Sequence, residues 1–282
     1  MRSSSWPRSP LGWAGFAATA VVLALVAYAL TTYALSREVG SDVSAYWNAA
    51  ERLRTGQPLY VAGAANASDL YRYAPWFAAA WIPFTYLDRA AVTAGWVGLM
   101  IAATLVSTVP LLRRGPAGWG AFVIFAPLQL QAAVFGNVKP LLVLVLLWGV
   151  ERRGGPLWIA LGASLKAAPL VLALVYAGRG EWRRAGLTVA LTALLVASAF
   201  AFDLSAYPTA LGGGQMSLTE VSVWLWLPVA LVAMGATLAL ARTRFGWLAG
   251  SIAMIFTLPR LLDYEFNFVL VGLAELKERR VP

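Results

Sequence analysis

Long uncharged stretches separated by short polar segments dominate this chain. Residues 11–35 carry no charge over 25 positions. At about 1.5 Å per helical residue this length crosses a bilayer core of about 30 Å. Arg2 and Arg8 precede the stretch, which is longer than the apolar part of a cleaved signal peptide. The pattern predicts a retained first membrane span with the N-terminus inside.

The longest polar segment, residues 36–74, follows this span. Its first half, Ser41 to Thr55, has helical periodicity, with Ser41 as a suitable N-cap and Gly56 as a suitable stop. The apolar positions on one face are Val43, Trp47, Ala50 and Leu53. We expect an amphipathic helix in this first outer loop, lying at the membrane interface with Trp47 as its anchor.

Nine further apolar runs complete the chain: 75–87, 90–112, 117–135, 138–150, 157–178, 185–202, 222–241, 246–259 and 261–274. Several have only 13 or 14 residues, too few for a perpendicular span, which indicates broken helices shielded by their neighbours. We predict an all-α polytopic membrane protein, a bundle of about eight to ten transmembrane or half-spanning helices. Residues 1–282 are expected to form a single integral membrane domain. Its parts are the first span (11–35), the outer loop (36–74), the remaining helices (75–275) and a cytoplasmic tail (276–282).

The charged residues assign sides to these helices. The formal net charge is +9, and the basic residues cluster between apolar runs as expected for cytoplasmic loops. The clusters are Arg113-Arg114, Arg152-Arg153, Arg183-Arg184, Arg242 with Arg244, and Lys277 with Arg279 and Arg280. The run 157–178 should therefore rise, turn near Lys166–Pro169 and return. For 75–112 two alternatives stay open: either 75–87 remains interfacial, or Arg113-Arg114 lies outside.

Composition excludes several classes of function. The chain is 60% hydrophobic and 12% charged, with a mean hydropathy of +0.69, which argues against a water-soluble enzyme. It contains no Cys and no His, so zinc modules, disulfide scaffolds and imidazole bases are excluded. Proton transfer must depend on carboxylates, tyrosines or lysines. No basic stripe with interleaved aromatic residues is present, so nucleic-acid binding is not expected. Arginine-rich, alanine-rich composition favours a bacterial source, and hence a multi-pass protein of the bacterial plasma membrane.

An ionisable group within or beside the membrane is costly and is therefore a functional candidate. Asp42 starts the expected amphipathic helix, where it serves either as a helix cap or as a general base at the lipid–water boundary. Lys166 is the single charge in its run and partners either a phosphate or an internal carboxylate, Glu220 or Glu265.

Three other polar segments are also functional candidates, and each has an ordinary structural explanation as its alternative. Tyr71-Arg72-Tyr73 has the composition of an aromatic belt with a snorkelling arginine. The segment 135–140, with Asn137 and Lys139, also reads as an ordinary Gly-Asn turn before a proline. The segment 258–265, with Arg260, Tyr264 and Glu265, interrupts the last hydrophobic stretch and indicates a kinked helix break at a cavity.

The order of these motifs resembles that of the GT-C membrane glycosyltransferases, especially glycosyltransferase family 87, over roughly residues 11–275. The segments that carry the resemblance are Ser41-Asp42-Val43-Ser44-Ala45-Tyr46-Trp47-Asn48, Gly56-Gln57-Pro58-Leu59-Tyr60, Tyr73-Ala74-Pro75-Trp76, Gly136-Asn137, Lys166-Ala167-Ala168-Pro169, and Pro259-Arg260 with Tyr264-Glu265. The family usually has Gly-Gln at Gly136-Asn137 and Tyr-Asp at Tyr264-Glu265. Each difference keeps the chemical type and moves the functional group by one methylene.

The resemblance implies a GT-C-like bundle that acts as a hexosyltransferase. A sugar, with mannose as the favoured candidate, would move from a polyprenyl-phosphate-sugar donor to a lipid or glycan acceptor on the outer side. Asp42 would be the catalytic base, and Lys166 with Arg260 would bind the donor phosphate. The remaining expected substrate-binding residues are Tyr46, Arg72, Tyr73, Asn137, Lys139, Tyr264 and Glu265. No metal and no cofactor are expected, because the lipid-linked sugar is itself a substrate. The expected partners are the donor, the acceptor and membrane lipid, without nucleic acid or an obligatory protein partner.

Two alternatives belong to other classes. A lipid or glycan transporter or flippase also uses broken helices and lone intramembrane charges, although no internal repeat is evident. A non-catalytic relative that acts as a membrane scaffold would not require Asp42 and Lys166 together on the outer side.

Overall fold

The computed structural model describes residues 13, 17, 20–22, 24–25, 28–29, 31–33, 36, 38–63, 70–207 and 216–276. Within these residues the chain is helical and contains no strand, which confirms the all-α class. The expected first span, 11–35, lies largely outside the described residues, although those of its positions that are described are helical. The expected tail lies outside them too, apart from Leu276.

The helices follow the predicted apolar runs closely. They are α2 (Ser41–Arg54), α3 (Pro75–Trp81), η1 (Ile82–Tyr86), α4 (Arg89–Thr108), η2 (Val109–Arg114), α5 (Gly115–Val134), α6 (Lys139–Gly149), α7 (Gly155–Leu165), η3 (Ala168–Leu172), α8 (Ala173–Gly178), α9 (Trp182–Ala197), η4 (Ser198–Ala201), α10 (Leu218–Val221), α11 (Val223–Leu240), α12 (Gly246–Phe256), η5 (Asp263–Phe268) and α13 (Val269–Ala274). Among the described residues, four continuous stretches are long and apolar enough to cross a membrane: Arg89–Arg113, Ala117–Val134, Trp182–Ala201 and Val223–Leu240. Shorter apolar helical stretches of 10–17 residues are Lys139–Gly149, Gly155–Leu165, Ala168–Gly178 and Gly246–Phe256, so the exact number of spans stays a prediction.

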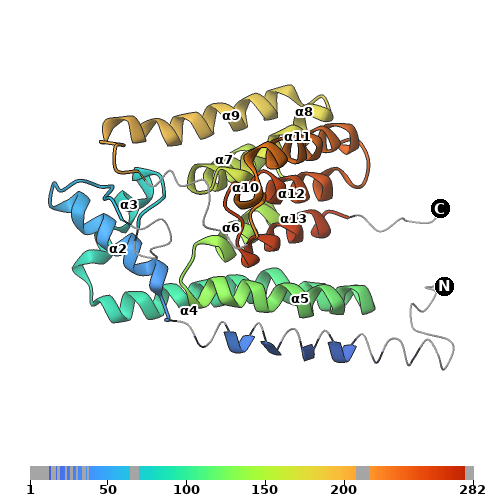
Figure 1. Cartoon of the computed structure of the whole chain (residues 1–282), viewed down its shortest axis with the longest axis horizontal. Helices are drawn as coiled ribbons and strands as arrows, with labels where there is room; N and C mark the ends of the chain where they lie inside the picture. Colours follow the sequence, from blue (N-terminus) through green and yellow to red (C-terminus); the bar gives the residue numbers. More distant parts are fainter. Residues whose placement is uncertain are drawn as a thin grey trace.

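The long helices run roughly parallel or antiparallel to one another (Figure 1). In that view α4 and α5 lie side by side along one edge and α9 lies along the opposite edge, packed on α7. The helices α6, α11, α12 and α13 fill the space between. A buried apolar core joins the central helices; its largest members include Leu146, Ile159, Leu172, Met254 and Phe268.

Helix α2 covers one end of this bundle. It buries Val43, Ala45, Tyr46, Ala49 and Ala50 in a second core formed with α3 and the residues around it. Of the predicted apolar face, Val43 and Ala50 are buried, whereas Trp47 and Leu53 are half-buried. The amphipathic helix therefore packs against protein on its apolar side.

The start of α2 differs from the prediction. Ser41 is not the N-cap; the cap position is Gly40, in a left-handed conformation with φ 74°. The reason is that backbone bonds to the end of α5 replace a side-chain cap. The Gly40 N–H donates to the Val134 carbonyl at 2.8 Å, and the Asp42 N–H donates to the Phe135 carbonyl at 2.9 Å. The predicted stop is confirmed, since Gly56 follows the end of the helix with φ 71°.

The chain doubles back at Lys166, as predicted. Helix α7 ends at Leu165, and Lys166 is extended, with φ −141° and ψ 113°. The chain then returns through η3 and α8, so that the Tyr176 hydroxyl donates to the Val150 carbonyl beside the start of α7. The two arms form a helical hairpin with Lys166 at its tip.

The basic loops gather at the opposite end of the bundle from this tip. Arg184 Nη2 donates to the Arg152 carbonyl at 2.7 Å, and Arg242 Nε donates to the Gly178 carbonyl at 3.0 Å. We call the residues 150–155, 178–184 and 241–246 the basic end. Since Trp96, near the start of α4, donates to the Gly136 carbonyl at the other end, the end of α4 with Arg113 lies toward the basic end. Helices α3 and η1 pack against α2. This arrangement fits the first alternative for 75–112, in which 75–87 stays interfacial, and the side of Arg113-Arg114 stays a prediction.

Candidate active site

Five segments bring polar side chains together at the end of the bundle opposite the basic end. They are the start of α2, the non-helical residues just before α3, the α5–α6 turn, the α7–η3 break, and the residues from the end of α12 into η5. The side chains in question are Asp42, Arg72, Tyr73, Asn137, Lys139, Lys166, Arg260, Tyr264 and Glu265, which we call the polar cluster. All of them were candidates from the sequence, although up to 223 positions separate them along the chain.

Asp42 lies in the first turn of α2, where a carboxylate interacts favourably with the helix dipole. One of its oxygens, Oδ2, accepts a hydrogen bond from Asn137 Nδ2. Burial raises the pKa of the Asp42 carboxyl above its ordinary value, and the Asn137 bond and the nearby cations Lys166, Arg72 and Arg260 offset only part of this rise. Asp42 is therefore a stronger base than an exposed aspartate, and its charge is supported from several sides.

The turn between α5 and α6 places Asn137 against Asp42. Gly136 has φ +72°, and a Cβ built there would lie 2.5 Å from a Val43 methyl group. Glycine is thus required both by conformation and by the close approach of α2. The Asn137 Oδ1 accepts from the Lys139 N–H at 3.0 Å, which is the bond of an ordinary Asx turn. The Nδ2 bond to Asp42 is the additional contact that a Gly-Asn turn alone does not predict.

Glu265 bridges two lysines. Its Oε2 pairs with Lys139 Nζ and its Oε1 with Lys166 Nζ, the latter at 3.1 Å. The Lys139 side chain has no exposed surface and its ammonium lies over the rings of Tyr264 and Phe268, at 5.0 and 4.5 Å from their centroids. The Lys166 side chain is 16% exposed. Of the alternatives for Lys166, an ion pair with Glu265 is therefore present, and Lys166 remains the accessible member of the pair of lysines.

Arg72 and Arg260 complete the charge of the cluster. Both are half-buried and both act electrostatically on Asp42. The pKa of Arg72 is lowered by burial and by the charge of Arg260, so the two guanidinium groups are close enough to repel each other. Arg260 Nε is buried without a hydrogen-bond partner among the described residues.

The cluster carries more positive than negative groups. Within the described residues it holds four cations, Lys139, Lys166, Arg72 and Arg260, and two carboxylates, Asp42 and Glu265, while the Asp263 carboxylate lies beside it. An excess of positive charge that is partly withdrawn from water is costly unless an anion compensates it. The arrangement is therefore suited to an anionic ligand.

Tyrosines hold the segment 71–74 in place. The Tyr46 hydroxyl accepts from the Val138 N–H at 3.2 Å and donates to the Tyr73 hydroxyl at 3.2 Å. Tyr71 is buried, with its hydroxyl donating to the Ala74 carbonyl at 2.7 Å. An aromatic belt facing lipid does not describe these side chains, because they form a buried aromatic network with Phe77.

Two supporting residues escaped the sequence reasoning. Gln131 Nε2 donates to both carboxylate oxygens of Asp263, at 3.0 and 3.3 Å, and its position as an amide inside an apolar run was an available signal. The Tyr207 hydroxyl donates to the Arg72 carbonyl at 3.1 Å, and nothing in the sequence around Tyr207 indicates this contact. Across residues 38–63, 70–207 and 216–276, no three Asp or Glu side chains gather in a way that suits a metal ion.

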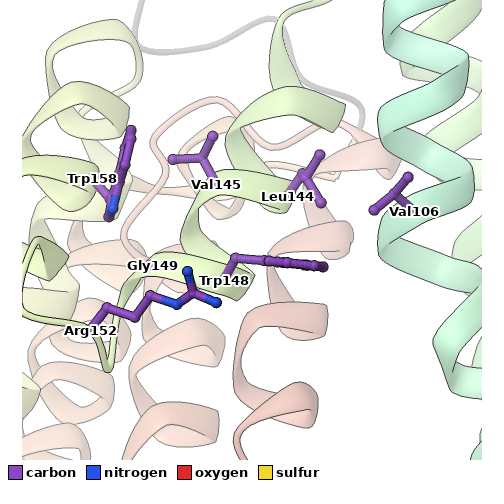
Figure 2. A pocket seen from close by; sticks show the side chains of 7 residues that line it. All are labelled: Val106, Leu144, Val145, Trp148, Gly149, Arg152 and Trp158. Atoms are coloured by element: carbon purple, nitrogen blue, oxygen red, sulfur yellow. The ribbon is translucent and has the colours of Figure 1, made fainter.

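Two hollows on the surface lie away from this site. One groove of about 280 Å³ lies between α4, α6 and the start of α7, toward the basic end (Figure 2). Its wall is apolar apart from Arg152, which lies beside Trp148. Another, of about 490 Å³, lies between α11 and α12 and is lined by apolar residues. Neither contains a member of the polar cluster, so charge and hydrogen bonding identify the site rather than the shape of a cavity.

Comparison with known proteins identifies a family. The sequence profile described as glycosyltransferase family 87 matches residues 71–212, half of the chain. The match includes Arg72, Tyr73, Asn137, Lys139 and Lys166, whereas Asp42 and the segment 259–265 lie outside it. No curated protein matches the chain, and no solved structure does.

Proposed function

Because this chain belongs to glycosyltransferase family 87 and is a membrane glycosyltransferase, we propose that it moves a hexose, for which mannose is the favoured candidate, from a polyprenyl-phosphate donor to a lipid or glycan acceptor. One observation supports this most strongly: the Asp42 carboxylate lies at the same end of the bundle as three cations that act on it, Lys166, Arg72 and Arg260. A base and an anion site side by side are what transfer from a phosphate leaving group requires.

Asp42 is the general base in this proposal. Its carboxylate takes the proton of the acceptor hydroxyl while the hydroxyl oxygen attacks the anomeric carbon of the donor. Burial strengthens the base by raising its pKa. The Asn137 bond occupies Oδ2, so Oδ1 is the oxygen proposed to receive the proton.

The cations stabilise the leaving group. As the bond from the anomeric carbon to the phosphate oxygen breaks, its electron pair stays on the phosphate, which gains one negative charge. Groups that meet this growing charge bind the transition state more tightly than the ground state. Lys166 and Arg260 are the proposed ligands, because Lys166 is the accessible lysine and Arg260 has a buried nitrogen without a partner among the described residues. Arg72, Tyr73 and Tyr264 are proposed to line the sugar.

Sidedness is part of the proposal. Arginine-rich loops favour the cytoplasm, and the basic end collects Arg152, Arg153, Arg183, Arg184 and Arg242. The polar cluster at the opposite end is therefore proposed to face outward. In this orientation the sugar of the lipid-linked donor reaches Asp42 from the outer leaflet.

The experiment is a transfer assay with purified protein. Polyprenyl-phosphate-mannose labelled in the sugar is incubated with the protein and a membrane lipid extract as the source of acceptors, beside a matched reaction with labelled GDP-mannose. We expect label to move into a new extractable product only from the lipid donor. Transfer from the nucleotide sugar, or no transfer from either labelled polyprenyl-phosphate-mannose or labelled polyprenyl-phosphate-glucose, would contradict the proposed donor class.

A further inference from the structure

Asn137 contacts two other members of the polar cluster, Asp42 and Lys139. Its carboxamide lies between the Asp42 carboxylate and the backbone of Lys139, and Lys139 in turn shares Glu265 with Lys166. The residue is 3% exposed, which leaves little room for a direct contact with a sugar. Its contacts indicate a role other than binding substrate.

The orientation of this carboxamide is fixed by its neighbours. Oδ1 accepts from the Lys139 N–H at 3.0 Å, which a carboxamide nitrogen cannot do, because it has no lone pair to offer. The Nδ2 group therefore faces Asp42 and donates to Oδ2. Backbone bonds from Gly40 to Val134 and from Asp42 to Phe135 hold the two segments together on either side.

We propose that Asn137 is a positioning residue for the transfer reaction: it holds Asp42 Oδ2, and thereby turns Oδ1 toward the hydroxyl of the acceptor. The inference rests on the proposed function, since it assigns the orientation of the base that this function uses. A hydrogen bond to a carboxylate is roughly twice as strong as one between neutral groups, so a single donor suffices to select one rotamer of the aspartate.

The bond also affects when Asp42 is ionised. Several charged or titratable groups face this carboxylate: Lys166, Arg72, Arg260, Tyr46, Tyr73 and Tyr264. Among the influences that lower the pKa of Asp42, the Asn137 bond is the largest. Without it the carboxyl keeps its proton up to a higher pH, and the base is lost sooner as the solution is acidified.

Asn137→Asp tests the inference, because it preserves shape and still offers an oxygen to the Lys139 N–H but replaces the donor with a carboxylate. We expect kcat/KM at pH 7 to fall about 10–100-fold, within the range typical for a misplaced base, and the acidic limb of its pH profile to move to higher pH. The KM for the donor should change less than about threefold, in keeping with a defect in the chemical step. Asn137→Gln retains the donor and should leave the acidic limb near that of the wild type.

Gln129→Glu is the control. It makes the same amide-to-carboxylate change in a buried side chain that lies outside the polar cluster and donates to the Ser107 hydroxyl, and the acidic limb should not move. If Asn137→Asp fails to fold, Asn137→Ala takes its place, because it too removes the donor.

The outcomes separate this inference from the proposed function. If Asp42→Asn is inactive and the Asn137→Asp acidic limb coincides with that of the wild type, the positioning role is wrong and the base assignment stands. A shift shared equally by Gln129→Glu also overturns the positioning role. If Asp42→Asn keeps full activity, the proposed base itself fails.

Discussion

At the scale of single residues, Gly136 determines whether Asn137 can reach the proposed base, Asp42. Its positive φ turns the chain from α5 into α6 and leaves space for Val43 of the neighbouring helix. Asn137, the next residue, then meets Asp42. A side chain at position 136 both strains the backbone and pushes α2 away, so conformation and packing impose the same requirement.

Gly136→Ala is therefore expected to lower the free energy of unfolding by about 1–3 kcal/mol, from the left-handed conformation and the overpacking together. Its transfer activity should fall further than its stability, because the displacement occurs between Asp42 and Asn137. Thermal unfolding in detergent and a transfer assay on the folded fraction measure the two effects.

The control is Gly98→Ala in α4, where a Cβ meets nothing within 4 Å. It should match or exceed the stability of the wild type, since alanine is the better helix former. Equal melting temperatures and activities for Gly136→Ala and Gly98→Ala would contradict the role given to the turn.

The members of the polar cluster could be picked out from the sequence, but their partners could not. Asp42, Lys166 and Arg260 are charged residues that lie beside or within long apolar runs. Lys166 and Glu265 are 99 positions apart, however, and periodicity says nothing about which distant carboxylate closes such a pair. Ser41 as a cap was wrong for a related reason: the first N–H groups of α2 bond to the end of α5, a tertiary contact that local patterns do not contain.

At the scale of elements, the break between α7 and η3 gives the two lysines different environments. Lys139 begins α6 and is enclosed by Glu265, Tyr264 and Phe268. Lys166 follows the end of α7 in extended backbone and keeps part of its side chain exposed. The break itself was predictable, because a lone lysine followed by Pro169 interrupts an apolar run of 22 residues, 157–178.

Lys166→Met should therefore mainly lower donor binding and turnover, whereas Lys139→Met should mainly lower stability. Removing Lys166 takes a proposed phosphate ligand from the site, so we expect weaker donor binding and slower turnover, each by about 10-fold or more, with a small change in melting temperature. Removing Lys139 leaves Glu265 one buried partner short, and we expect stability to fall by about 2–4 kcal/mol.

Donor affinity and melting temperature measured for both variants separate these roles. If Lys166→Met binds the donor as the wild type does and transfers sugar at the wild-type rate, the ion pair with Glu265 is structural and the phosphate site lies elsewhere.

At the scale of the whole molecule, charge is divided between two ends. The loops of the basic end meet through Arg179, Arg184 and Arg242, while the polar cluster occupies the other end. The sequence alone left the side of Arg113 open, because it did not show whether 75–87 crosses the membrane. The segment packs on α2 at one end of the bundle, which favours the alternative in which 75–87 stays interfacial and α4 crosses the membrane.

The natural absence of cysteine makes this division testable. Arg152→Cys places a thiol in an exposed position at the basic end, and Ser205→Cys places one in an exposed position near the polar cluster. In intact cells we expect a membrane-impermeant maleimide to label Ser205→Cys at once and Arg152→Cys only after permeabilisation. The reverse pattern would put the polar cluster in the cytoplasm.

The central claim, that Asp42 is the base of a sugar transfer, has one direct test. Asp42→Asn keeps the shape of the side chain and an oxygen that accepts from Asn137, and it removes only the ability to take a proton. We expect transfer from labelled polyprenyl-phosphate-mannose to fall by about 10²–10⁴-fold while donor binding and melting temperature stay near the wild-type values. Asp203→Asn, the same change in an exposed loop residue, should transfer sugar normally. Near-wild-type transfer by Asp42→Asn would contradict the account.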